Sequence, residues 1–83
     1  MKAVYFAWVR ERIGKPEELL DLPGEIRTAG DVIAFLKTKG EEYEHAFENA
    51  KTIRVALDHA HVKHDATILG AREIAFFPPM TGG

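Results

Sequence analysis

The 83-residue sequence predicts an α+β fold in which one main helix and a second short helix pack against a mixed β-sheet. Two observations carry this prediction: apolar residues alternate with a strand period near both ends, and the middle of the chain has helical spacing. A third is its shortness, because so few residues cannot form two separate cores. We therefore expect one domain over residues 1–79, followed by a flexible tail over residues 80–83.

The first two elements are expected to be strands. Residues Lys2 to Val9 are rich in aromatic and β-branched side chains, which are typical of a strand. Arg10 to Gly14 should make a short helical turn that the glycine closes. Glu17 to Leu22 then reads as a second strand, stopped by the turn pair Pro23-Gly24. The short connection between the two strands favours a hairpin.

Two helices are expected next. Thr28 can cap the first helix, and Asp31 favours the positive end of its dipole. Gly40 should stop this helix, and a shorter helix follows over Glu41 to Ala50. The predicted buried positions of the two helices are Val32, Phe35 and Leu36, then Tyr43, Ala46 and Phe47.

The rest of the chain is expected to form strands, because apolar and polar residues alternate along it. Thr52 to Asp58 is a half-buried strand, His61 to Asp65 a short one after a turn, and Arg72 to Phe77 the last. Pro78 and Pro79 end it because neither has an N–H for the ladder. Two strands, a helix and two or three strands form a β-grasp arrangement, in which the first and last strands lie side by side in the middle.

Composition excludes several classes of protein. The formal net charge is −2 with scattered Lys and Arg, which argues against nucleic acid or anionic lipid as a partner. No apolar run approaches the roughly 20 residues that cross a bilayer, and the start lacks a signal-peptide pattern, so we expect a cytoplasmic protein without a membrane partner. The absence of cysteine excludes disulfides, thiolate zinc sites and a side-chain thiol nucleophile.

Three histidines in the second half are candidate metal ligands. His59, His61 and His64 lie close in sequence, but no residue pattern fixes a third and fourth ligand. Solvent-exposed turn histidines are the expected interpretation, so no metal is predicted.

The ending "FFPPMTGG" is the main functional signal. The prolines keep the chain extended, and the six residues from Pro78 to Gly83 reach about 20 Å. Gly82 and Gly83 lack Cβ and make the narrowest possible end, which could enter a partner's active site. A frayed terminus is the alternative.

Aromatic residues on the central strands indicate a docking surface. Phe76 and Phe77 alternate across the sheet, so one should pack inward and the other should anchor an interface. Tyr5 and Trp8 on the neighbouring strand pose the same choice, and an exposed aromatic patch would suit docking.

Two motifs carry a resemblance to a known family. One is "AFFPPMTGG", with Phe76, Phe77, Pro78, Pro79, Thr81, Gly82 and Gly83; the other is "FAWVRERIG", with Phe6, Ala7, Arg10, Glu11 and Gly14. Over essentially the whole chain, the sequence resembles the small, sulfur-carrier subunits of molybdopterin synthase, within the ubiquitin-like superfamily. It departs from that pattern at Gly70 to Glu73, where the family often has Asp-Gly-Asp-Glu, and at Asp58, where an Asn is common.

The resemblance implies a function for the tail. In the family, a ubiquitin-activating-like adenylyltransferase uses ATP to adenylate the terminal carboxylate, here that of Gly83, and a sulfur donor converts it to a thiocarboxylate. The loaded tail then enters the large subunit of a heterotetramer, where its sulfur attacks the cyclic pterin phosphate precursor. The chain would thus be a sulfur donor with no bound cofactor, and the active site would lie on the large subunit.

The implied site follows residue by residue. Gly83 would carry the sulfur and Gly82 would pass beside it through the partner. The expected partner-binding residues are Phe76, Phe77, Pro78, Pro79, Met80 and Thr81.

Three other functions remain open at this point. The chain could carry sulfur for thiamine or for tRNA thiolation. It could be a protein modifier conjugated through Gly83, or a plain binding module.

Overall fold

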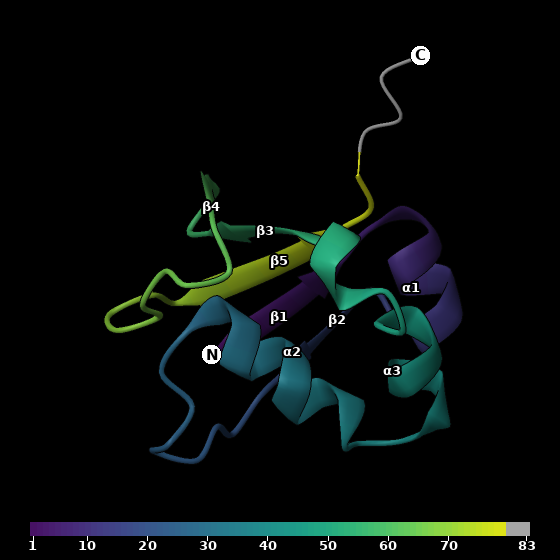
Figure 1. The fold of residues 1–83 in the computed structure, drawn as a ribbon, viewed down its shortest axis with the longest axis horizontal. Helices are drawn as coiled ribbons and strands as arrows, with labels where there is room; N and C mark the ends of the chain where they lie inside the picture. Colours follow the sequence, from purple (N-terminus) through teal and green to yellow (C-terminus); the bar gives the residue numbers. More distant parts are fainter. Residues whose placement is uncertain (80–83) are drawn as a thin grey trace.

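The computed structural model describes residues 1–79 and contains a five-stranded mixed sheet with helices packed on one face (Figure 1). The strands are β1 (Lys2–Tyr5), β2 (Glu17–Leu19), β3 (Arg54–Leu57), β4 (Ala60–Val62) and β5 (Glu73–Phe77). The helices are α1 (Ala7–Ile13), α2 (Ala29–Lys37), α3 (Glu41–Ala46) and the 3₁₀ turn η1 (Ala50–Thr52).

The strand order β2-β1-β5-β3-β4 is that of a β-grasp sheet. The first and last strands lie side by side in the middle and are parallel, with Tyr5 opposite Phe76. The other pairs are antiparallel, and β3 sets Arg54 opposite Phe77. The fold class predicted from the sequence is therefore confirmed.

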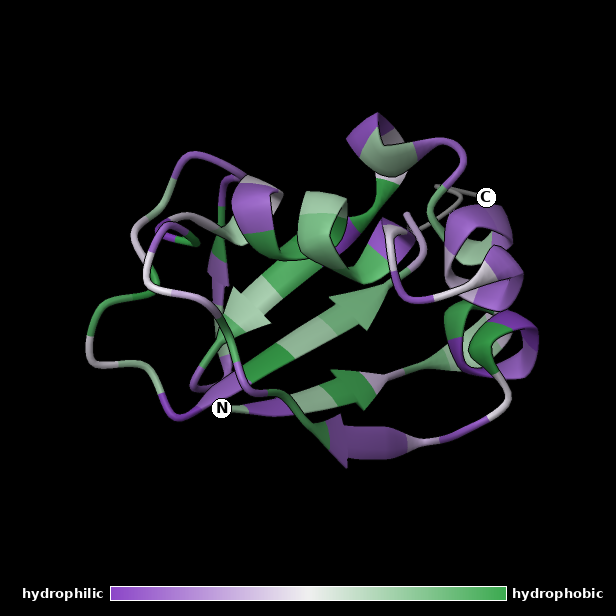
Figure 2. Ribbon diagram, turned by 90° about the horizontal axis from the view of Figure 1, so that it is seen from below, coloured by the Kyte–Doolittle hydropathy of each residue, from purple (hydrophilic) through white to green (hydrophobic). Residues whose placement is uncertain are grey.

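One hydrophobic core lies between the sheet and the helices. Apolar side chains from α1, α2 and α3 pack there against alternate residues of the central strands, among them Ala3, Tyr5, Val55, Ile74 and Phe76. Figure 2 shows the central strands largely green and the edge strand β2 largely purple. Within residues 1–79, no helix is both long and apolar enough to cross a membrane.

The first strand is shorter than the sequence predicted, and a helix takes over its second half. The chain turns at Ala7, whose φ of 52° breaks the extended run. Val9 and Ile13 are then four residues apart on one buried face of α1, which explains why apolar residues continue beyond Tyr5. Gly14 ends this helix as predicted, with a left-handed φ of 90° and its N–H donating to the carbonyl of Arg10.

The main helix begins as predicted and ends two residues early. Thr28 and Asp31 form a reciprocal capping box, in which each side chain accepts from the other's backbone N–H. The helix closes at Thr38, whose hydroxyl donates to the carbonyl of Phe35. Gly40 was expected to be the stop, but it is the N-cap of α3 instead.

Candidate functional site

The central strand β5 positions the root of the tail. The strand pairs with β1 up to Phe76 and with β3 up to Phe77. Beyond Tyr5, the N–H of Phe6 donates to the carbonyl of Phe76 at 3.0 Å, which ties the start of α1 to the end of β5 (Figure 1). Pro78 and Pro79 are half-buried and outside any strand. Met80, Thr81, Gly82 and Gly83 lie outside the described residues, so their roles stay predictions.

Phe76 is the inward-pointing aromatic of the pair. Its side chain is 0% exposed, and its ring lies 6.0 Å from that of Tyr5 and 5.4 Å from that of Phe47, measured between centroids. The first pair is stacked and the second is edge-on, both favourable arrangements. Phe76 therefore anchors the root of the tail in the core, which confirms that one of the two phenylalanines packs inward and identifies it as Phe76.

Phe77 points to the opposite face, as the strand period requires. It is half-buried, and its ring lies 5.1 Å from the imidazole of His61 in an edge-on arrangement. Phe6, which follows the Tyr5–Phe76 pair on the neighbouring strand, is 46% exposed. Two aromatic side chains thus stand near the point where the tail leaves the sheet.

Small side chains form a row across the sheet next to these aromatics. The register places Val4 opposite Ala75, Ala75 opposite Ala56, and Ala56 opposite His61. Ala56 and Ala75 lie outside the core cluster beneath the helices, yet they are only 6% and 7% exposed. We call Val4, Ala56, Ala75, Phe77 and Phe6 the open face; the exposed Phe6 and the half-buried Val4 and Phe77 are the parts of it that a protein partner could contact.

From the sequence, Tyr5 and Trp8 are expected on one strand with one of them pointing inward, but Trp8 does not lie on a strand. Tyr5 is buried in the core, and Trp8 lies half-buried on α1 because the chain is no longer a strand there. The guanidinium carbon of Arg12 lies 4.4 Å from the centroid of the Trp8 ring. Phe6 supplies the exposed aromatic instead. The alternation of β1 would have identified it, since Phe6 follows Val4 by two residues.

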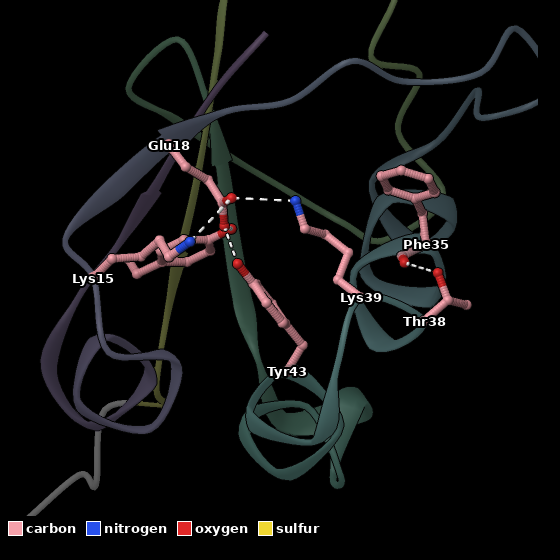
Figure 3. A network of polar contacts seen from close by, with 7 residues as sticks. Lys15, Glu18, Phe35, Thr38, Lys39 and Tyr43 are labelled. Atoms are coloured by element: carbon pink, nitrogen blue, oxygen red, sulfur yellow. Dashed lines mark hydrogen bonds and ion pairs between the residues drawn. The ribbon is translucent and has the colours of Figure 1, made fainter.

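A carboxylate network near the edge of the sheet was not predicted from the sequence. Glu18 points inward from β2 and accepts hydrogen bonds from the hydroxyls of Tyr5 at 2.8 Å and Tyr43 at 2.6 Å (Figure 3). The ammonium groups of Lys39 and Lys15 lie 3.2 and 3.6 Å from its other oxygen. This network joins β1, β2 and α3.

The network changes the acidity of its members. Burial favours the neutral form of Glu18, but the hydrogen bonds from Tyr43, Tyr5 and Lys39 outweigh it and lower the pKa of the carboxyl. Burial, and then the bond to Glu18, raises the pKa of Tyr43 to about 12 and that of Tyr5 further. Both hydroxyls are therefore fixed as donors, and their role is to hold the fold together.

The three histidines have separate surroundings. His59 approaches Glu73, His61 packs on Phe77, and the half-buried His64 contacts the carbonyl of Ile53 through Nε2 at 2.7 Å. His64 therefore differs from the expected exposed turn residue. Within residues 1–79, no three side chains of the types that bind metals are grouped closely enough to hold an ion.

The loop that departs from the family pattern has its own stabilisation. Asp58 has a φ of 48°, and its Oδ1 accepts from the N–H groups of Arg72 and Glu73, each at 3.0 Å. Asp58 lies in the turn between β3 and β4, whereas Gly70 turns the segment before β5 with a φ of 81°. Asp58 thereby fixes the start of β5. Arg10 and Glu11 are exposed on α1.

Within residues 1–79, the candidate site is the root of the tail and its immediate surroundings. Phe76 fixes this root in the core, and Pro78 and Pro79 continue beyond β5 outside any strand. Phe77 and the exposed Phe6 lie beside it.

Comparison with known proteins gives full-length matches. The family model described as "ThiS family" matches residues 3–83. The molybdopterin synthase sulfur carrier subunit of Haemophilus influenzae is 34% identical over 100% of this chain and 99% of the relative. The subunit of the same name from Escherichia coli is 28% identical over the same shares.

The fold also matches a solved structure. SAMP1 from Haloferax volcanii superimposes with a TM-score of 0.73 at 24% identity, over 100% of this chain and 98% of that one. This likeness concerns the fold alone, whereas the family match spans the fold and the tail. From the match over residues 3–83, this chain belongs to the ThiS family.

Proposed function

We propose that this chain is the sulfur-carrier subunit of a molybdopterin synthase and donates sulfur from a thiocarboxylate at Gly83. The observation that carries the proposal is the match to two relatives of that name over the whole chain, including the Gly-Gly end. The structure supports it through the root of the tail, which a buried aromatic anchors in the central strand.

The proposed loading needs two steps because a carboxylate is a poor electrophile. In the first, an adenylyltransferase of the ubiquitin-activating type joins the Gly83 carboxylate to the α-phosphate of ATP and releases pyrophosphate. In the second, a sulfide-equivalent donor attacks the carbonyl carbon, forms the C–S bond and expels AMP. The thiocarboxylate sulfur is then the nucleophile that attacks the cyclic pterin phosphate precursor in the large subunit.

The strand, the open face and the tail have different proposed roles. Phe76 holds the strand, and the open face with Phe77 and Phe6 docks on the large subunit or the adenylyltransferase. Pro78 and Pro79 carry the chain away from the sheet, and Met80 to Gly83 enter the partner. A reach of about 20 Å separates the docking surface from the chemistry.

The names of the relatives favour molybdopterin over thiamine or thiolated tRNA as the destination of the sulfur. Conjugation to other proteins has no support beyond a shared fold. The experiment is to supply the chain with its adenylyltransferase, ATP, a sulfide donor, the large subunit and the pterin precursor, and to measure molybdopterin.

The control is the same chain with one alanine added after Gly83, which displaces the carboxylate without touching the domain. We expect molybdopterin from the natural chain and none from the extended one. Equal product from both would refute the proposal. If the chain is loaded with sulfur but no molybdopterin forms, the sulfur is destined for a different acceptor.

A further inference from the structure

We propose that a basic groove beside the root of the tail binds a carboxylate-rich surface of the large subunit. The basic groove is defined by Lys51, Arg54 and Lys63. The inference deepens the proposed function and rests on it, because it takes the large subunit as the partner that receives the tail.

The groove lies between η1, the start of β3 and the end of β4. It has a volume of about 220 Å³, and its lining includes Lys51, Arg54, Val55, Val62, Lys63 and His64. The side chain of His64 is held in place because Nε2 donates to the carbonyl of Ile53. The lining therefore combines three exposed cations with apolar side chains.

The three cations lack internal partners in the described part of the chain. Lys2, Arg12, Lys15 and Lys39 each form an ion pair with a glutamate. Lys51, Arg54 and Lys63 form none within residues 1–79, although the chain as a whole carries a net charge of −2. The nearest acidic residue in sequence is the exposed Asp65. Other cations of the described residues are also without an ion pair, but these three line one groove, so positive charge gathers here although the whole chain is negative.

Two of these cations come together at the end of a strand pair. Val55 pairs with Val62; Arg54 begins β3 just before Val55, and Lys63 directly follows the end of β4. Both line the same groove, and like charges held near each other repel. A carboxylate bound between them would remove this repulsion, and Arg54 could hold it with two parallel hydrogen bonds.

The position of the groove identifies the partner. Arg54 is also paired with Phe77 on β5, so the groove adjoins the open face at the exit of the tail. A protein that takes the tail into its active site would cover both surfaces together. The cations are exposed and come from three separate segments, which suits a protein surface better than a single enclosed anion.

The test uses two triple variants of the full chain with equal charge. In the first, Lys51→Gln, Arg54→Gln and Lys63→Gln neutralise the groove; in the control, Arg27→Gln, Lys37→Gln and Arg72→Gln neutralise cations elsewhere. The three control residues also form no ion pair within residues 1–79. The association rate with the large subunit is measured by stopped flow at low salt and at high salt.

Neutralising the groove should slow association about tenfold or more at low salt, and the difference should shrink at high salt because screening removes the attraction. The control should stay within about twofold of the natural chain. The groove variant should melt at the same temperature or higher, since a like-charge pair has been removed.

The outcomes separate the two proposals. Failure of the natural chain to bind the large subunit would refute the proposed function itself. Normal binding with equal rates for both triple variants would overturn the groove alone. Faster binding by the groove variant would show that the three cations oppose docking, which also overturns the inference.

Discussion

Replacing Phe76 by alanine should separate the two roles of the adjacent phenylalanines. The Phe76 ring is fully buried between Tyr5 and Phe47. A buried aromatic covers roughly 150 Å² or more, which at about 25 cal/mol per Å² corresponds to about 4 kcal/mol. Replacing a buried phenylalanine by alanine typically lowers the free energy of unfolding by about 3–5 kcal/mol, a figure that includes the cost of the cavity left behind. A domain of 83 residues has a stability of only about 4–12 kcal/mol.

Urea unfolding followed by circular dichroism is the assay. With a slope of about 1–2 kcal/mol per M, the midpoint of Phe76→Ala should fall by about 2–4 M. Phe76→Leu keeps much of the volume and should lose about 1–2 kcal/mol, so it remains measurable if the alanine variant does not fold.

Phe77→Ala is the matched control on the open face. Its ring is only half-buried, so Phe77→Ala should lower the free energy of unfolding by only about 1 kcal/mol. The same variant should weaken binding to the large subunit by more than it lowers stability. Equal losses of stability for the two alanine variants, or a loss below about 1 kcal/mol for Phe76→Ala, would refute the assignment of Phe76 to the core anchor.

Three further predictions concern the edge network, the helix cap and the tail. Because the folded pKa of Glu18 is lowered, its contribution to stability is present above about pH 4.3 and is lost as pH falls through the folded pKa. Glu18→Gln should cost about 1–2 kcal/mol near neutral pH and flatten the acid limb of urea midpoints, whereas the exposed Glu25→Gln should do neither. Thr28→Ala should cost about 1 kcal/mol by removing the capping box, and Thr28→Ser should restore it; no thermal shift in the alanine variant would contradict the cap. Gly82→Ala should leave the melting temperature unchanged and slow loading or transfer, and normal turnover by this variant would exclude a narrow path for the tail.

The sequence predicted the elements whose signals are local. Thr28 and Asp31 mark the start of α2, and alternation across β5 predicted that one of Phe76 and Phe77 points inward; the structure shows that it is Phe76. The errors arose where two periods fit the same residues. Apolar residues from Lys2 to Val9 match a strand throughout, and only tertiary packing of Val9 and Ile13 shows that the second half is a helix.

Contacts between distant segments were beyond the reach of local pattern. Glu18 resembles any charged residue of a short edge strand, yet it meets Tyr5 and Tyr43 only after β1, β2 and α3 have come together. The groove has the same character, since the register of β3 and β4 is what brings Arg54 and Lys63 together. The tail motif needed no fold to be noticed, because its chemistry lies in the residue types themselves.

The proposed function depends on the terminal carboxylate of Gly83, which would carry the sulfur. Its most direct test is the intact mass of the chain after incubation with its adenylyltransferase, ATP and a sulfide donor, followed by mapping of the C-terminal peptide. We predict a gain equal to one sulfur minus one oxygen, confined to the peptide that ends at Gly83. An unchanged mass with an adenylyltransferase shown to be active, or a gain located elsewhere in the chain, would contradict the account.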